Sequence, residues 1–290
     1  MQVRVATPAC RNNYLFMWSN PMCKPLWFLP FLAVAFTPSA HADDAQPCDS
    51  GTVEAIARWA EAGVNGKLVE WNKPDGLIAA AACKAMPNAP GTTIAAIAFG
   101  ISHEKMSGYA DGYKLQVIAL VEAGKVVAAT QSILEEDAAT AVGSYRIDTA
   151  RYILSKDVRA FGVVFYNSAP GPSCPEQGQI DENEYLTLFI REGERLRAMF
   201  VTHLYEWNLI DGGSCSLDNK DARRESARMI IGVEKTSSHG FADLSITAHV
   251  TEMLFKHNEG VSVTGKRTIR RVLKYDGQSY GKGYNPFLGD

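Results

Sequence analysis

Residues able to carry out chemistry are thinly spread along this sequence. A serine hydrolase needs its nucleophile on a strained strand-to-helix turn such as G-x-S-x-G, and we expect no such segment after residue 42. His103-Glu104 lacks the second histidine of a zinc-protease helix. The run Gly260–Lys266 approaches a phosphate-binding loop, but Arg267 stands where Ser or Thr should bind magnesium. We therefore expect no catalytic residue, metal site or cofactor, and interpret Gly260–Lys266 as strand and hairpin.

The remaining polar candidates are isolated. The histidines that follow residue 42 are His103, His203, His239, His249 and His257. Asp211, Asp218 and Asp221 flank Cys215, but their spacing fits no calcium loop. A hydrolase whose active-site residues come from separate loops stays an alternative, with His203, Asp211 and Asp218 as its candidates.

The densest basic run lies late in the chain, at Lys266, Arg267, Arg270, Arg271 and Lys274. Alternate residues of a strand face opposite sides, so Lys266, Arg270 and Lys274 should share one face, and Arg267 and Arg271 the other. One interpretation is an edge strand whose charges prevent aggregation. The other is a docking patch for an acidic partner, formed by Lys266, Arg270 and Lys274.

Cysteine usage indicates disulfides. Beyond residue 42 the cysteines are Cys48, Cys83, Cys174 and Cys215. An even number in an exported chain favours paired thiols, and no C-x-x-C spacing supports zinc. We expect Cys48 to pair with Cys83, and Cys174 with Cys215, because each pair closes a loop within one region. Four cysteines allow three connectivities, and the other two stay open.

Export itself is indicated by the N-terminal segment. Residues 25–36 are twelve residues without a charge, and small residues follow up to Ala42. This is the pattern of a secretory signal peptide, and the apolar core is too short for a membrane anchor, which needs about 20 residues. We expect cleavage after Ala42 and a periplasmic or secreted protein with no stable membrane anchor. Met17 and Met22 are alternative starts to Met1.

The composition is that of an ordinary globular protein. Among 290 residues, 46% are hydrophobic and 21% charged, which excludes collagen-like and broadly disordered chains. The formal charge is −3, and removal of residues 1–42 takes three basic and no acidic residues, leaving −6 over 248 residues. We therefore expect no nucleic-acid partner.

Two helices are expected before residue 92. Asp49 and Thr52 offer N-caps, and apolar residues at helical spacing follow until Gly63. The Ala-rich stretch 77–86 is predicted as the second helix. The expected organisation is a signal peptide over 1–42, a helical N-terminal cap over 43–91 and an antiparallel β domain over 92–290.

The rest of the chain has a β pattern. The expected strands are 93–101, 114–122, 125–134, 145–154, 158–167, 184–190, 194–206, 223–235, 241–254 and 261–275. Short links such as Glu122–Gly124 and Arg191–Gly193 favour hairpins. Residues 241–251 alternate, so one face should be core and the other in water, whereas 158–167 and 184–190 are apolar on both registers, as expected between two layers. The class is mainly β, an antiparallel meander that is propeller-like, a barrel or a sandwich, with a short helical N-terminal cap.

One segment resembles a known repeat. Gly240-Phe-Ala-Asp-Leu-Ser-Ile246 is similar to the Gly-aromatic-x-Asp-Leu-x-apolar strand of integrin-type (FG-GAP-like) β-propeller repeats, over about one blade. Those repeats bind calcium through an Asp-rich loop before this strand. Here Thr236–His239 precede it, so the resemblance implies no calcium.

These observations favour a non-enzymatic exported module that binds another protein or an envelope component. One concrete version is a periplasmic immunity or inhibitor protein that blocks a toxin. The alternatives are the periplasmic hydrolase and an envelope scaffold with no single ligand.

Overall fold

The computed structural model describes seven stretches of the chain. They are residues 46–63, 78–101, 112–169, 180–212, 221–256, 259–281 and 283–287, without the side chains of 180–183. The chain divides into two compact units, Met1–Asp43 and Asp44–Asp290, and the second holds every described residue. The expected cleavage site at Ala42 and the expected Cys174–Cys215 pair lie outside the described residues.

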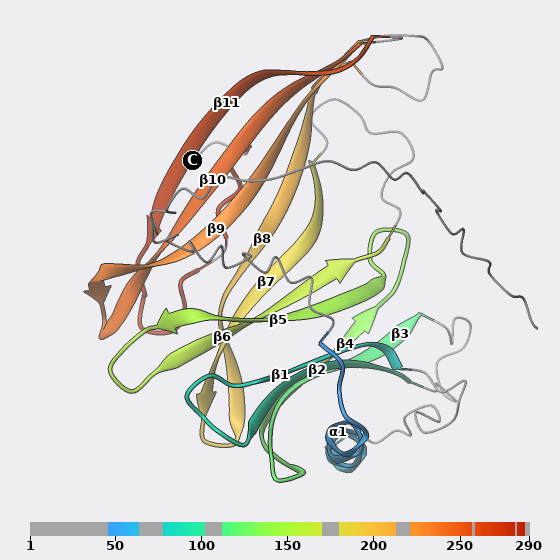
Figure 1. The fold of residues 1–290 in the computed structure, drawn as a ribbon, viewed down its shortest axis with the longest axis vertical. Helices are drawn as coiled ribbons and strands as arrows, with labels where there is room; N and C mark the ends of the chain where they lie inside the picture. The colour runs from blue at the N-terminus through green and yellow to red at the C-terminus, as the bar shows by residue number, and fades with distance from the viewer. Residues whose placement is uncertain are drawn as a thin grey trace, which may run out of the picture. The chain divides into compact units, whose positions relative to one another are not determined.

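The described residues form one helix and eleven strands (Figure 1). In chain order they are α1 (Ser50–Gly63), β1 (Ile78–Ala85), β2 (Thr92–Gly100), β3 (Tyr113–Glu122), β4 (Lys125–Glu135), β5 (Val142–Ile153), β6 (Arg159–Asn167), β7 (Ile180–Glu192), β8 (Arg195–Asp211), β9 (Ala222–Ser238), β10 (Phe241–Lys256) and β11 (Gly260–Leu273). The mainly β class with a short N-terminal helix is therefore confirmed. Strands β2–β11 fall on the ten segments expected from the sequence.

The first expected helix is confirmed as α1, and its N-terminus is capped by Asp49. The Thr52 amide donates to Asp49 Oδ1 at 2.9 Å and the Thr52 hydroxyl to Asp49 Oδ2 at 2.7 Å. These hydrogen bonds lower the pKa of the Asp49 carboxyl. They also satisfy an amide that the first helical turn leaves unpaired.

The second expected helix is wrong, because residues 78–85 form strand β1. This strand pairs antiparallel with β2, from Ile78 opposite Phe99 to Ala85 opposite Thr93. Alanine favours helix only weakly, by tenths of a kcal/mol per residue over most other types. The ladder with β2 supplies hydrogen bonds and burial to β1 and overrides that preference, so only α1 makes this region helical.

The sheet consists of two antiparallel meanders, β1–β4 and β5–β11, in which every consecutive pair of strands is hydrogen-bonded. The meanders meet where β4 runs parallel to β8, with Ala129 paired to Arg195. The strand order through this contact is β1-β2-β3-β4-β8-β7-β6-β5. Each meander is as expected, and the parallel contact joins them into one mixed sheet.

These eight strands curl round a shared interior, as in a barrel, because β1 and β5 at the two ends of the order lie next to each other. Every one of the eight strands contributes to the enclosed cluster. Its buried members are Ala82, Ile94, Ala96, Ala98, Ile118, Leu120, Ala128, Tyr145, Ile147, Phe161, Val163, Phe189 and Leu196. We call this cluster the enclosed core.

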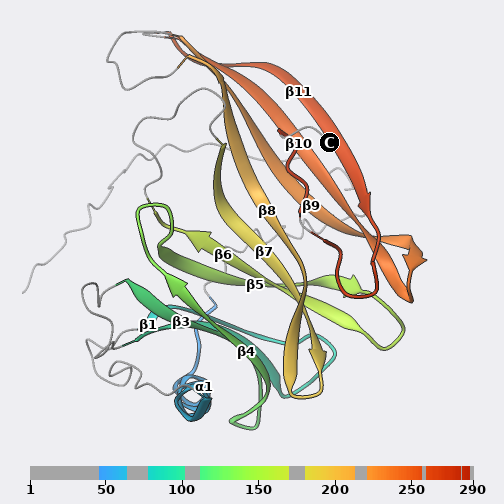
Figure 2. The same ribbon diagram turned by 180° about the vertical axis from the view of Figure 1, so that it is seen from behind.

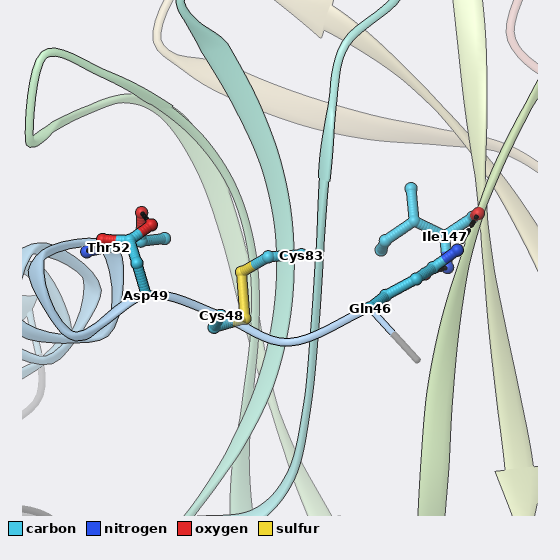
Figure 3. Close-up of a disulfide and its surroundings, with 6 residues drawn as sticks. All are labelled: Gln46, Cys48, Asp49, Thr52, Cys83 and Ile147. Carbon is cyan, nitrogen blue, oxygen red and sulfur yellow. Dashed lines mark hydrogen bonds between the residues drawn. A yellow bond between two sulfur atoms is a disulfide. The ribbon is translucent and has the colours of Figure 1, made fainter. Parts of the chain in front are cut away.

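Gln46 closes the seam between β1 and β5 (Figure 3). Its backbone carbonyl accepts a hydrogen bond from Cys83 of β1 at 2.8 Å. Its side-chain amide pairs with Ile147 of β5, accepting from the Ile147 N–H at 2.6 Å and donating to the Ile147 carbonyl at 3.1 Å. The Cys48–Cys83 disulfide, the first of the two expected pairs, ties the same segment to β1. Gln46 is thus hydrogen-bonded to both β1 and β5 and links the two ends of the strand order.

A second core lies on the outer side of β1–β4, under α1 (Figures 1 and 2). Ile56, Ala57 and Ala60 of the helix are fully buried there. They pack with residues such as Ile97 and Val117 of the sheet.

A third core lies on the other side of β5–β7, beneath β8–β11, and we call it the outer core. In β6, Val163 belongs to the enclosed core and Val164 to the outer core. In β7, Phe189 belongs to the enclosed core and Leu188 to the outer core. The expectation that these strands are apolar on both faces because they lie between two layers is therefore confirmed.

The segment after β11 completes the outer core. Tyr275 stacks on Phe241 with 4.7 Å between ring centroids, and the Tyr280 hydroxyl donates to the Ala242 carbonyl at 2.6 Å. Both tyrosines are buried. The residues after β11 therefore cover part of the outer core and add two buried side chains to it.

Strand β10 only partly follows its expected alternation. Leu244, Ile246 and Ala248 are fully buried, as expected for the core face. On the other face Asp243 and Ser245 are also buried, at 2% and 4% exposure, so the expectation of a fully wetted face is wrong at this end. The Thr236 hydroxyl donates to Asp243 at 2.7 Å across a bulge, which explains how a carboxylate is accommodated there.

Replacing Gln46 with Ala should open the β1–β5 seam. The substitution leaves the N–H and carbonyl of buried Ile147 without their partner, and we expect a loss of about 2 kcal/mol in the free energy of unfolding. Urea denaturation measures it. Gln131→Ala, at an exposed position, is the matched control and should change stability by less than about 0.5 kcal/mol. Equal stabilities for the two variants would contradict the closing role of Gln46.

Candidate functional site

The basic run lies on the edge strand of the sheet. Strand β11 pairs with β10 and with no other described strand, so β11 is an edge strand, as expected; the role of its charges stays a prediction. Gly260–Lys266 forms the first half of this strand, as expected, and not a phosphate-binding loop.

The two faces of β11 have different surroundings. On the face shared with the outer core, Arg267 contacts Glu225, and Arg271 lies over the ring of Tyr284 at 5.2 Å. On the opposite face Arg270 contacts Glu234. Both arginines of the inner face are therefore in contact with other residues of the fold.

Lys266 is exposed and makes no ion pair with another described residue. Lys274 is exposed as well, and its charge helps to lower the pKa of the Asp243 carboxyl. Together with Arg270 these lysines are the candidate partner-binding residues that the sequence indicates. Lys266 and Arg270 share the outer face of β11, and Lys274 follows the last residue of the strand.

Strand register extends this outer face across β8–β11. One row of opposed residues runs through Tyr205, Arg228, His249 and Thr268, and the neighbouring row contains Trp207, Ser226, Thr251 and Lys266. We call this surface, with Arg224, Ile230, Arg270 and Val272 on adjoining rows and Lys274 at its end, the basic face. Strands β8–β11, which carry this face, are shown in Figures 1 and 2.

Aromatic rings hold two of the arginines on the basic face. The guanidinium of Arg228 lies 5.2 Å from the centre of the Tyr205 ring. That of Arg224 lies 5.1 Å from the Trp207 ring and 5.3 Å from the Phe255 ring. Such contacts retain the positive charge while they fix its position.

Apolar side chains are exposed between these cations. Ile230 is 58% exposed, Val263 56% and Val272 47%, although all three lie on well-paired strands. A surface that combines ordered cations with exposed β-branched residues has the composition of an interaction site rather than of a merely solvated face.

Acidic residues are few on the basic face. Among its described residues they are Glu234 and the buried Asp243. Hydrogen bonds from Ser245 and Arg270 lower the pKa of the Glu234 carboxyl, and those from Thr236 and Ser238 lower the pKa of Asp243. Both carboxyl groups therefore accept hydrogen bonds from residues of the fold. The basic face is positive, although the total charge of the chain is negative.

Sequence reasoning found the β11 part of this face and missed Arg224, Arg228, Tyr205 and Trp207. The sequence pattern that could have indicated these residues lies in 223–235, where positions that face the core alternate with polar positions. That alternation became informative only once the register with β8 and β10 was known.

The described histidines His203, His239 and His249 have separate neighbours within the fold. The His203 ring packs at a tilt against Tyr185 with 4.5 Å between ring centroids, and burial lowers the pKa of His203. His239 Nδ1 lies 2.9 Å from the Tyr275 carbonyl, and His249 Nδ1 lies 3.3 Å from the Thr268 hydroxyl. His103 and His257 lie outside the described residues.

The residues considered for a hydrolase are not brought together. His203 and Asp211 lie eight residues apart on β8, which is about 26 Å along an extended strand. Asp218 lies outside the described residues. Among the side chains that the structure describes, no group of three or more His, Cys, Asp or Glu residues could hold a metal ion.

A G-x-S-x-G spacing does occur at Gly277–Gly281, and the sequence reasoning overlooked it. The structure places it in the turn after β11, where the Ser279 N–H donates to Asp276 at 2.7 Å. The described residues after it contain no helix, and no hydrogen bond joins the Ser279 hydroxyl to a described histidine. The segment thus lacks the strand-to-helix geometry that exposes a catalytic serine.

Comparison with known proteins gives no match, whether to a family model, to a curated protein or to a solved structure. Within the described residues, no helix has the length and apolar character needed to cross a membrane.

The lowered pKa of His203 predicts an acid-sensitive contribution to stability. Burial disfavours the protonated ring in the folded state, so stability should fall as pH drops below about 6.5, the ordinary pKa of histidine. In His203→Phe this component should be absent. Urea unfolding of both proteins between pH 8 and 5 measures the difference, and parallel pH profiles would contradict the assignment.

Proposed function

We propose that this protein is a non-enzymatic exported binding module that recognises an acidic protein partner through the basic face. The observation that carries the proposal is the difference between the two faces of β11: Lys266 on the outer face is exposed and makes no described ion pair, while Arg267 on the inner face is matched by Glu225. Lys274, which follows the strand, adds a second exposed cation. Unmatched cations at the surface attract an acidic partner and speed its association.

The exposed apolar residues favour a protein as the partner. Ile230, Val263 and Val272 would lose contact with water only against a surface of comparable size, and protein interfaces combine an apolar centre with a charged rim. The net negative charge of the chain argues against nucleic acid, for which phosphate neutralisation dominates affinity.

The proposed location is the periplasm or the exterior of the cell. It rests on the apolar segment 25–36, on the expected cleavage after Ala42 and on the Cys48–Cys83 disulfide, a bond that persists in oxidising compartments. In this setting the concrete form of the proposal is an immunity or inhibitor protein that covers an acidic surface of a toxin. The separation of His203 and Asp211 gives the alternative of a hydrolase no support.

Charge reversal tests the proposal. Lys266→Glu combined with Lys274→Glu should weaken capture of the partner from an envelope extract by about tenfold and flatten its salt dependence. Arg270 is left intact, because its reversal would also repel Glu234. Quantitative mass spectrometry of the captured proteins measures the effect.

The matched control reverses Lys84 and Lys156, which are exposed on β1 and on the β5–β6 turn and make no described ion pair. It changes the net charge by the same amount and should leave capture unchanged. Equal capture by the wild type and the Lys266/Lys274 variant would refute the proposal, as would a captured partner without an acidic surface.

A further inference from the structure

The sheet has a break between β4 and β8. The Ala129 N–H donates to the Glu194 carbonyl at 3.1 Å, beside the single pair that links the two strands. Beyond this point β4 and β8 diverge (Figure 2). The second half of β4 therefore has β3 on one side and no described strand on the other.

The open edge of β4 carries hydrogen-bonding groups. In an antiparallel strand the N–H and carbonyl of alternate residues point to the same edge. Because the Ala129 N–H points away from β3, those of Gln131, Ile133 and Glu135 do so as well, and no described strand pairs with them there. Ile133 is also 59% exposed. This edge is a template for one more strand.

The edge of β8 across the break is already used. Tyr280 donates to the Met199 carbonyl and Gly283 to the Val201 carbonyl, both at 2.9 Å. Since β8 and the chain end border the break on its far side, an incoming segment pairs with β4 as a single strand. A second copy of this chain would bring its own β3 along with β4 and so fits the break less well.

A cleft of about 1140 Å³ begins at this break. The β4 stretch 125–131 forms one wall, the turn between β7 and β8 another, and Trp59 of α1 lies at its side. The cleft therefore adjoins both the start of the open edge and an aromatic ring.

The charge of the cleft is positive. Its lining includes Lys125, Arg191 and Arg195 against one acid, Glu194. Arg191 lies 3.4 Å from Glu122, whereas Lys125 and Arg195 are exposed and form no ion pair with a described residue. Arg195, which pairs with Ala129, thus lies at the start of the open edge, and Lys125 lines the cleft at the opposite end of β4.

We propose that this cleft binds an extended acidic peptide, which adds to the edge of β4 as a strand. Backbone groups of Gln131, Ile133 and Glu135 supply the pairing, and Lys125 and Arg195 receive carboxylates of the peptide. Recognition of this kind takes its affinity from main-chain hydrogen bonds and its specificity from alternate side chains. The site is separate from the basic face, and the inference does not depend on the proposed function.

Synthetic peptides test the inference directly on the full-length protein. A labelled eight-residue peptide of alternating Glu and Val should bind, as followed by fluorescence anisotropy. The Gln-Val peptide should bind at least tenfold more weakly, and Lys-Val more weakly still. A Glu-Val peptide N-methylated at alternate amides, which cannot complete the ladder, should not bind. Equal binding of the four peptides, or binding of none, would overturn the proposal.

Variants locate the site. Lys125→Glu with Arg195→Glu should raise the Kd of the Glu-Val peptide at least tenfold, and Ile133→Pro, which removes an N–H on the open edge but none that pairs with β3, should do likewise. The Lys84/Lys156 and Lys266/Lys274 variants should bind as the wild type, so this test can fail independently of the basic face. A dimer in sedimentation that Ile133→Pro abolishes would assign the edge to a second copy instead and overturn the peptide proposal.

Discussion

The whole fold depends on strands that are buried on both faces. In β6 and β7, neighbouring residues enter different cores: Val163 and Phe189 enter the enclosed core, Val164 and Leu188 the outer core. One stretch of sheet thus supplies a wall to each core, and the sheet must curl one way towards β1 and the other way towards β11. Most described side chains in this part of β6 and β7 are buried. Their burial stabilises the fold by about 25 cal/mol per Å² of apolar surface removed from water. Polar binding groups are therefore excluded from this stretch of the sheet and lie on strands that have an exposed face or an open edge.

The two surfaces proposed for binding lie away from this doubly buried stretch. On β11 the face towards the outer core satisfies its cations, with Arg267 against Glu225 and Arg271 on the ring of Tyr284, while the opposite face leaves Lys266 exposed. At the break β4 and β8 share a single pair, so the edge of β4 stays open beyond Ala129, next to Arg195. In both places a cation without an internal partner lies beside backbone or apolar groups that another molecule could cover.

Local sequence pattern predicted what depends on local periodicity. The ten strands from Thr92 onward, the two-sided burial of β6 and β7, the helix capped at Asp49 and the Cys48–Cys83 pair all follow from alternation, capping and cysteine placement. What it missed depends on partners distant in the chain. Strand β1 is a strand because β2 lies beside it, and Gln46 closes a seam to Ile147, 101 residues away. Arg228 became part of the candidate site only through its register with Tyr205 and His249.

Residue-resolved amide hydrogen exchange tests the central claim, that one sheet is shared by two cores and is interrupted between β4 and β8. The amides of Val163, Val164 and Leu188 should exchange only through global unfolding, because both faces around them are buried. The amides of Gln131 and Ile133 should exchange many orders of magnitude faster, although Thr130 and Ser132 between them, whose amides face β3, remain protected. Protection of Gln131 and Ile133 equal to that of β6 would contradict the account.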